Sequence, residues 1–126
     1  LQSTQRYDSR NLEVGAISRQ LKILATELRI PIVVLCQLNR TQDETEEPGL
    51  MSLRDSGELE QNANKIVFLW KIDSDTGTIG VKVAKNRRGR TGIVQMGFDG
   101  SHMRFTELTE DYIRAAKKRG WRNESA

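Results

Sequence analysis

Apolar residues recur at steps of three and four in the first part of the chain, which is the spacing of one helical face. The preceding residues 2 to 11 are polar throughout. The recurring positions are Leu12, Val14, Ile17, Leu21, Leu24 and Leu28. This pattern predicts a polar loop followed by an amphipathic helix over about residues 11 to 29, which Pro31 ends because proline has no backbone N–H to donate.

Two later segments are short, unbroken apolar runs. Residues 32 to 36 and 66 to 70 are rich in β-branched and aromatic side chains, as in strands that a sheet buries on both faces. A second, shorter helix is expected at residues 58 to 64, directly before the second run. Because each run follows a helix, the order predicts an α/β fold with a mostly parallel sheet.

The C-terminal half has the alternation of a β-hairpin. Residues 79 to 84 and 93 to 98 predict two antiparallel strands, and the turn between them carries four cations, at Lys85, Arg87, Arg88 and Arg90. Residues 103 to 105 predict a short edge strand, and residues 109 to 119 a charged helix. We therefore divide the chain into a main unit at residues 1–108 and a charged helix or tail at residues 109–126.

Composition leaves several classes of protein open and excludes others. The chain has 126 residues, 37% hydrophobic and 29% charged, with a net charge of +3. This balance permits binding to nucleic acid without requiring it. A lone Cys36 excludes an internal disulfide framework, and no apolar run approaches the length of a membrane span. We expect a cytoplasmic protein with no membrane partner, and, since the sequence begins at Leu1, a chain cut from something longer.

Gln37 directly follows the first predicted strand. The carboxyl ends of strands in open α/β sheets hold ligands, and an amide at this place can sense a phosphate or a water. The alternative is that Gln37 caps the sheet edge through backbone hydrogen bonds.

The turn at residues 54 to 57 combines a cation with backbone N–H groups near a helix start. Arg54, Asp55 and Gly57 form a pattern that can grip phosphates. The alternative is a simple helix start, with Asp55 or Ser56 as its capping residue and Gly57 relieving strain.

Lys85 and Arg87 are two residues apart at the end of a predicted strand. Their side chains are expected to point the same way, toward one anion. The alternative is a solvated basic turn that guards a sheet edge. No His, Cys or carboxylate cluster has the spacing of metal ligands, so no metal site is predicted.

Three segments together resemble the C-terminal RecA-like motor domain of the DnaB family of hexameric replicative helicases. The resemblance covers about residues 1 to 108. It rests on the sequences Val-Leu-Cys-Gln-Leu-Asn-Arg at 34 to 40, Leu-Arg-Asp-Ser-Gly-Glu-Leu-Glu-Gln-Asn-Ala-Asn at 53 to 64 and Ala-Lys-Asn-Arg-Arg-Gly-Arg-Thr-Gly at 84 to 92. The implied fold is the C-terminal half of a RecA-like P-loop NTPase core, with a terminal antiparallel hairpin.

The resemblance implies roles for these residues. Gln37 would couple the γ-phosphate of ATP to the DNA loops, and Lys85 and Arg87 would reach a neighbouring subunit's ATP, with Arg87 as the arginine finger. The channel that binds single-stranded DNA would be lined by two loops. The first contains Arg54, Asp55 and Gly57, and the second contains Arg6 and Arg10. The implied partners are single-stranded DNA, further copies of the chain in a homo-hexamer, a primase and a helicase loader.

The chain departs from the family pattern in two places and lacks one motif. Arg88 and Arg90 stand where the family often has Asn and Pro, and Asp55 stands where Glu is common. No Gly-x-x-x-x-Gly-Lys-Ser/Thr occurs in the sequence.

We therefore expect the chain to be part of a helicase that couples ATP hydrolysis, with Mg²⁺, to translocation on DNA and duplex unwinding in replication. The isolated chain is expected not to hydrolyse ATP. A non-catalytic nucleic-acid-binding or ring-assembly module is the main alternative, and a recombinase-type ATPase is a weaker one.

Overall fold

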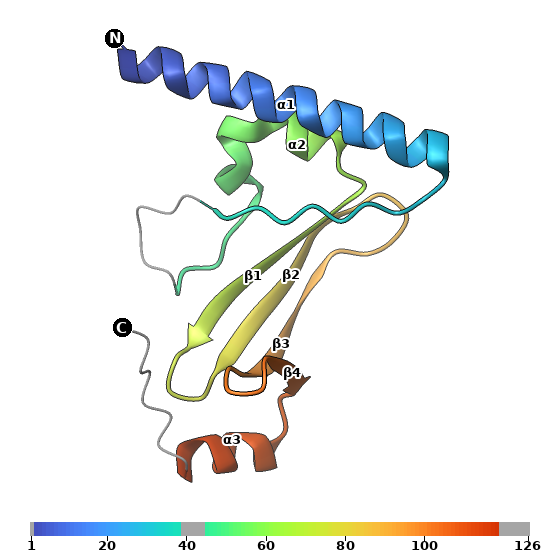
Figure 1. Ribbon diagram of the computed structural model, residues 1–126. Coiled ribbons are helices and arrows are strands. Elements are labelled where there is room, and N and C mark those ends of the chain that lie inside the picture. Colours follow the sequence, from blue (N-terminus) through green and yellow to red (C-terminus); the bar gives the residue numbers. More distant parts are fainter. Residues whose placement is uncertain (1, 39–44, 119–126) are drawn as a thin grey trace.

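The computed structural model describes residues 2–38 and 45–118, with the side chains of 12–38, 45–53 and 57–118. Figure 1 shows one long helix, a four-stranded sheet and shorter helices at the two ends of that sheet. The elements in chain order are α1 (Gln2–Leu28), the 3₁₀ helix η1 (Leu50–Ser56), α2 (Gly57–Asn62), β1 (Lys65–Asp73), β2 (Thr78–Asn86), β3 (Gly92–Asp99), β4 (Arg104–Glu107) and α3 (Glu110–Lys118).

Helix α1 begins well before the start that the apolar pattern predicts. The expected polar loop at residues 2 to 11 is wrong, because this stretch is helical from Gln2. The stretch contains neither Gly nor Pro, so nothing in it breaks a helix. The end agrees with the prediction. Arg29 has a positive φ of 55° and the Ile30 N–H donates to the Ala25 carbonyl oxygen at 3.1 Å, which closes the helix just before Pro31.

The sheet has the order β1-β2-β3-β4, and all of its neighbouring strands are antiparallel. The predicted hairpin is confirmed as β2 and β3, but the predicted mostly parallel sheet is not found in the described part of the chain. Residues 32 to 36, expected to form a parallel strand, are irregular, with Val33 and Leu35 exposed to 84% and 92%. A strand forms when neighbours pair with its backbone, and this segment pairs with none of the described strands (Figure 1).

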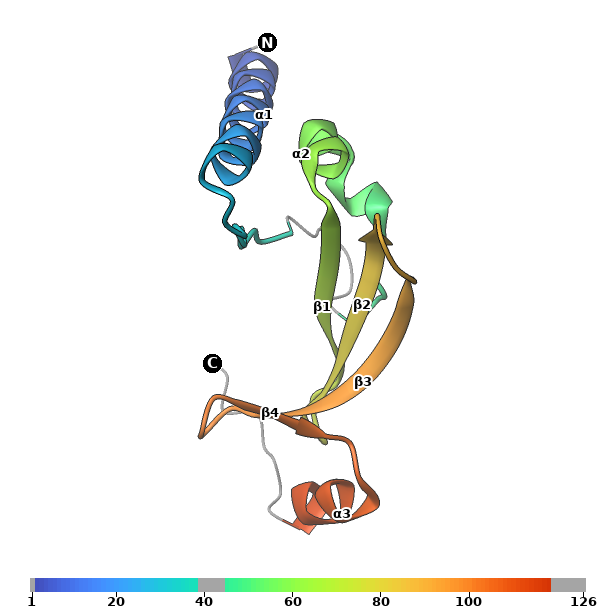
Figure 2. The ribbon, with the colours of Figure 1, turned by 90° about the vertical axis from the view of Figure 1, so that its right-hand side faces the viewer.

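The two faces of the sheet differ in burial. Phe68 and Trp70 on β1 are buried on one face, with exposures of 5% and 8%. Val67 and Leu69 alternate with them and point to the opposite face, where each is more than half exposed. Leu69 pairs with Val81, and Val81 pairs with Val94, so this open face is apolar across three strands. Figure 2 shows α1 and α2 at one end of the sheet and α3 at the other.

Helices α1 and α2 are fixed to each other by close and polar contacts. Gly15 lies against Glu58, where a Cβ atom would be 2.8 Å from the carboxyl carbon. The buried Ser18 hydroxyl accepts a 2.9 Å hydrogen bond from the Asn62 side chain. Arg19 lies 3.2 Å from Glu58, although both side chains are largely solvent-accessible and the pair contributes little. The result is a platform of α1 and α2 at one end of the sheet.

Candidate functional site

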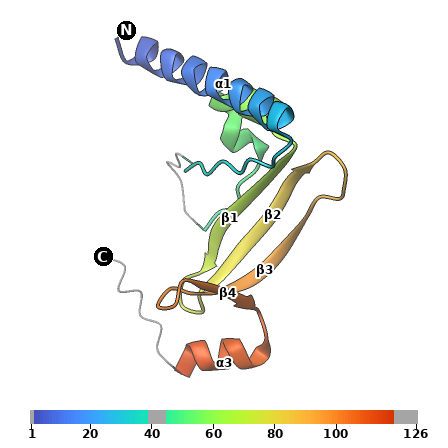
Figure 3. The ribbon, with the colours of Figure 1, turned by 45° about the vertical axis from the view of Figure 1, so that its right-hand side comes forward.

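The register of the hairpin brings the end of β2 to the end of α2. Strand β1 starts directly after the short connection that follows α2, and Lys65 pairs with Asn86 while Ile66 pairs with Lys85. Figure 3 shows the β2–β3 turn near the start of β1, and Lys85 and Arg87 reach the last residues of α2. The turn is closed locally, since the Gly89 N–H donates to the Asn86 carbonyl at 3.3 Å and the Asn86 side chain to the Arg90 carbonyl at 3.2 Å.

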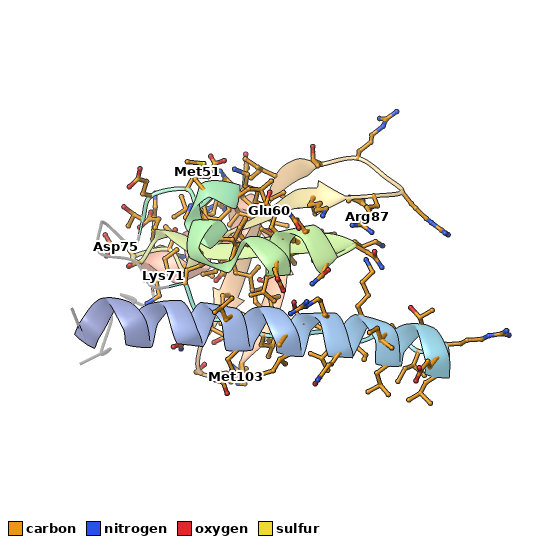
Figure 4. All side chains as sticks on the ribbon, turned by 90° about the horizontal axis from the view of Figure 1, so that it is seen from above. Met51, Glu60, Lys71, Asp75, Arg87 and Met103 are labelled. Atoms are coloured by element: carbon orange, nitrogen blue, oxygen red, sulfur yellow. The ribbon has the colours of Figure 1, made fainter. Side chains whose placement is uncertain are left out.

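Three cations donate hydrogen bonds to the carbonyl oxygens at the end of α2. Lys85 Nζ lies 2.5 Å from Glu60 O, an Arg87 guanidinium nitrogen lies 2.7 Å from Gln61 O, and Lys22 Nζ on α1 lies 2.9 Å from Asn62 O. The last carbonyls of a helix have no partner within the helix, so they accept such bonds readily. We call this group, made of Lys22, Lys85, Arg87 and the three carbonyls, the carbonyl cluster. Glu60 and Arg87 are labelled in Figure 4.

Asn64 binds Arg87 twice. The Arg87 backbone N–H donates to Asn64 O at 3.1 Å, and the Arg87 guanidinium donates to Asn64 Oδ1 at 3.2 Å. A guanidinium has five N–H donors and an ammonium has three. The bonds to Asn64, Gln61 and Glu60 use two side-chain donors of Arg87 and one of Lys85. As far as the described residues go, both cations thus keep donors for an anion, and Arg87 is exposed.

The start of the η1–α2 segment is also attached to β2. Lys82 Nζ lies 2.7 Å from Glu47 Oε1 and 3.0 Å from Pro48 O, and Pro48 is fully buried. Since Lys85 and Arg87 hold the other end, β2 and its turn fix both ends of the segment that contains η1 and α2.

The structure brings together some of the sequence-predicted site residues. Lys85 and Arg87 both reach carbonyl oxygens of α2, a contact that their spacing did not predict, and Arg88 and Arg90 are exposed elsewhere on the turn. That the two cations face one anion stays a prediction. Gln37 is exposed in the irregular segment, so its expected place at a strand end is wrong, and no contact with Lys85 or Arg87 is described.

The predicted DNA-binding residues lie on helices. Arg54 and Asp55 belong to η1, and Gly57 begins α2 with helical φ and ψ of −54° and −32°. A helical Gly57 relieves no strain, so that part of the alternative is wrong. Arg6 and Arg10 lie in α1 rather than in a loop. The side chains of Arg54, Asp55, Arg6 and Arg10 fall outside the described residues.

Sequence reasoning missed Lys22, Asn64 and Lys82 as parts of this site. Asn64 contacts Arg87 from the segment after α2, and Lys22 contacts the Asn62 carbonyl from α1. Nothing in the local sequence of either residue marks these contacts.

In the described residues, no group of three or more His, Cys, Asp and Glu side chains could hold a metal ion. No helix among them is long and apolar enough to cross a membrane.

Asp99 lies at the other end of β3, in a turn with Ser101 and His102. Hydrogen bonds from Ser101 and then from His102 lower the pKa of Asp99 from 3.8 to about 2. The distances are 2.7 Å from Ser101 Oγ and 2.8 Å from His102 Nδ1. This turn organises the β3–β4 connection and belongs to the sheet's far end.

Solved structures define the class of the fold. The chain is similar to a DnaB-like replicative helicase described in its interactions with primase, with a TM-score of 0.72 and 34% identity over 79% of this chain and 26% of that chain. It is also similar to a separately solved ATPase domain, with a TM-score of 0.71 and 34% identity over 79% of this chain and 38% of that chain. The fold is therefore α/β and RecA-like.

The family follows from the sequence comparisons. The model of the DnaB-like helicase C terminal domain matches residues 1–107, and the chain belongs to this family. The replicative DNA helicase DnaB of Haemophilus influenzae is 40% identical over 111 residues, which are 82% of this chain and 24% of that protein. The same helicase of Geobacillus stearothermophilus is 34% identical over 121 residues, 90% of this chain and 27% of that protein. The chain thus spans about a quarter of the length of these curated relatives.

Proposed function

We propose that this chain is part of the motor domain of a replicative DNA helicase and that it supplies the cations that complete a neighbouring subunit's ATP site. The observation that carries the proposal is the pair Lys85 and Arg87, both bound to the end of α2 with N–H donors that no described residue uses. Family membership supports the same conclusion. The parent protein would couple ATP hydrolysis to translocation along single-stranded DNA and to unwinding of the duplex.

Arg87 acts in this proposal as the arginine finger. Charge develops on the transferred phosphoryl group and the leaving oxygen, and a positioned guanidinium stabilises that charge in the transition state. Lys85 adds a point charge to the same phosphates. Gln37 remains the proposed sensor of the γ-phosphate, although the described structure does not bring it to the two cations.

ATP and Mg²⁺ are the proposed cofactors of the parent. The donors left on Lys85 and Arg87 fit a phosphate, since both are cationic and Arg87 is exposed. Mg²⁺ would neutralise phosphate charge when bound, but the described residues offer no cluster of ligands for it. The metal ligands are therefore proposed to belong to the remainder of the parent, as is the phosphate loop.

DNA binding is assigned in this proposal to η1, the start of α2 and the first part of α1. Arg54, Asp55 and Gly57 would hold the backbone of single-stranded DNA in the central channel of a homo-hexamer, with Arg6 and Arg10 contributing from α1. A primase and a helicase loader are the further proposed partners, and the cytoplasm is the proposed location. The remainder of the parent would complete a mostly parallel sheet beside β1, within a unit at residues 1–108 followed by a charged helix and tail at 109–126.

Substitution of Arg87 in the full-length parent tests the proposal. Arg87→Ala should reduce ATP hydrolysis by about a thousandfold or more, the scale of a lost arginine finger, while ATP binding stays nearly unchanged. Arg88→Ala, in the same turn and also exposed, is the matched control and should retain turnover. Full hydrolysis by Arg87→Ala would remove the finger role. DNA binding by the parent without any response to ATP would instead favour a non-catalytic binding module.

A further inference from the structure

Asn64 makes both a backbone and a side-chain hydrogen bond to the residue that the proposed function makes the arginine finger. We propose that Asn64 is a positioning residue for Arg87: Asn64 Oδ1 and the Gln61 carbonyl together hold the guanidinium in one orientation for a phosphate of the neighbouring subunit. The two distances are 3.2 and 2.7 Å, and each involves a different guanidinium nitrogen. This inference rests on the proposed function of Arg87.

Arg87 needs such support because of where it lies. It follows the last residue of β2, in an exposed turn, so no close packing of neighbouring side chains restricts its long side chain. A free arginine samples many rotamers and loses that freedom when it binds an anion. Two acceptors on separate residues fix the plane of the guanidinium beforehand, so less freedom is lost when the phosphate is bound.

The acceptors are themselves held in place. Gln61 belongs to α2, and the neighbouring Asn62 is tied to α1 through its side chain to Ser18 and through its carbonyl to Lys22. Asn64 closely follows α2, and its carbonyl also accepts the Arg87 backbone N–H at 3.1 Å. The guanidinium is thus oriented by the end of α2 and by Asn64 in the segment that follows it, and not by the turn that carries it.

The contact also leaves the guanidinium able to act. Bonds to the described residues use two of its five N–H donors, so three remain for a bidentate contact with a phosphate. Holding Arg87 on Asn64 therefore does not compete with binding the anion.

The test uses the full-length parent with Asn64→Ala, which removes the acceptor, and Asn64→Asp, which keeps an acceptor oxygen at the same place. Asn64→Ala should lower kcat for ATP hydrolysis by about tenfold to a hundredfold, the scale of a misplaced catalytic group, with little change in KM. It should weaken binding of ADP with aluminium fluoride, a mimic of the transferring phosphoryl group, by about tenfold and leave ADP binding unchanged. Asn64→Asp should restore most of both.

A double variant separates positioning from a structural role. In the Arg87→Ala background, adding Asn64→Ala should change neither hydrolysis nor analogue binding further, because residues that act as a unit are not additive. An additive loss in the double variant would overturn the inference. So would a loss in Asn64→Ala that Asn64→Asp does not restore and that is accompanied by a lower melting temperature. Normal kcat and analogue binding in Asn64→Ala, with Arg87→Ala inactive, would remove the positioning role and leave the proposed function intact. Full activity of Arg87→Ala would instead remove the proposed function, and the inference with it.

Discussion

The Trp70 side chain on β1 lies directly over Gly80, its cross-strand partner on β2. A Cβ atom at Gly80 would be 2.5 Å from the indole ring. Both residues are buried, and Trp70 is one of the few buried apolar side chains of the described chain. The ring therefore uses the space that a side chain at position 80 would fill.

Substitution at Gly80 should consequently destabilise the sheet. We expect Gly80→Ala to lower the free energy of unfolding by about 1 to 3 kcal/mol, because the indole must leave its place. Gly92→Ala on β3 is the matched control, since no atom lies within 4 Å of a Cβ there and alanine suits a strand at least as well. Urea unfolding followed by circular dichroism measures the difference, and equal stability of the two variants would contradict the expectation.

Arg54 should contribute one phosphate contact to DNA binding by the parent. Arg54→Ala is then expected to weaken binding to single-stranded DNA and to reduce the slope of log K against log salt by about 0.7. Lys71→Ala, a change of an exposed cation on β1, is the control for net charge. The measurement is a fluorescence titration at several salt concentrations. A slope equal to that of the unchanged protein would place Arg54 away from the phosphates.

The ion pair of Lys82 with Glu47, just before η1, should stabilise the folded chain by a small free energy. The ion pair with Glu47 is partly exposed, so its coupling energy is expected to be about 0.5 kcal/mol and to fall with added salt. A double-mutant cycle with Lys82→Met and Glu47→Gln measures this coupling. Lys82→Met alone should cost more than the coupling, because the bond to the Pro48 carbonyl is also lost. A zero cost for Lys82→Met would mean that the segment is held in some other way.

Asp99 should make stability depend on pH at the acid end. Its pKa is lowered to about 2 in the folded protein by the hydrogen bonds of Ser101 and His102, so the folded state favours the charged carboxylate. This contribution is present above about pH 4 and is lost as the pH falls toward 2. Asp99→Asn should therefore be less stable than the unchanged chain at pH 6 and no less stable at pH 2. Thermal unfolding at a series of pH values measures this, with Glu107→Gln on the neighbouring strand as the control. A constant difference over that range would contradict the shift.

The open face of the sheet should make the isolated chain associate with itself. Val67, Leu69 and Val94 are more than half exposed on one apolar surface, and such surfaces tend to find a partner. Replacing Val67 and Leu69 with Thr should shift the chain toward monomers in light scattering. Gln95→Thr, an exposed position on the opposite face of the sheet, should leave the association unchanged. If the chain without substitutions is monomeric, the prediction is wrong and the exposed apolar face does not cause association.

The sequence predicts the elements whose signals are local. The apolar spacing from Leu12 predicts α1, and the alternation at residues 79 to 84 and 93 to 98 predicts β2 and β3. The short helix α2 was also predicted. Each of these signals lies in the sequence of the element that it predicts. Residues 32 to 36 have the composition of a strand, but a strand also needs neighbours that pair with its backbone, and the described chain supplies none. The early start of α1 was not predicted because residues 2 to 11 are polar and lack the apolar spacing on which the prediction of the helix rested.

The candidate site was predictable only in its cations. Lys85 and Arg87 stand out because four cations share one turn, whereas their acceptors are carbonyl oxygens, which every residue has. Only the pairing of β1 with β2 brings these groups together. Asn64 is identified as part of the site only by its hydrogen bonds to Arg87 in the folded structure.

The register of β1 and β2 sets different limits on length changes along this hairpin. Lys65 opposite Asn86 is what brings Lys85 to the end of α2. The pairing already has a register shift at Ala84, which lies between the Val83–Val67 and Lys85–Ile66 pairs, so a further residue within β2 would move Lys85 from its place opposite Ile66. An extra residue near Gly89 would only lengthen the loop. Among proteins that share this hairpin, loop lengths are therefore free to differ, while the count of residues from Gly80 to Arg87 should stay constant.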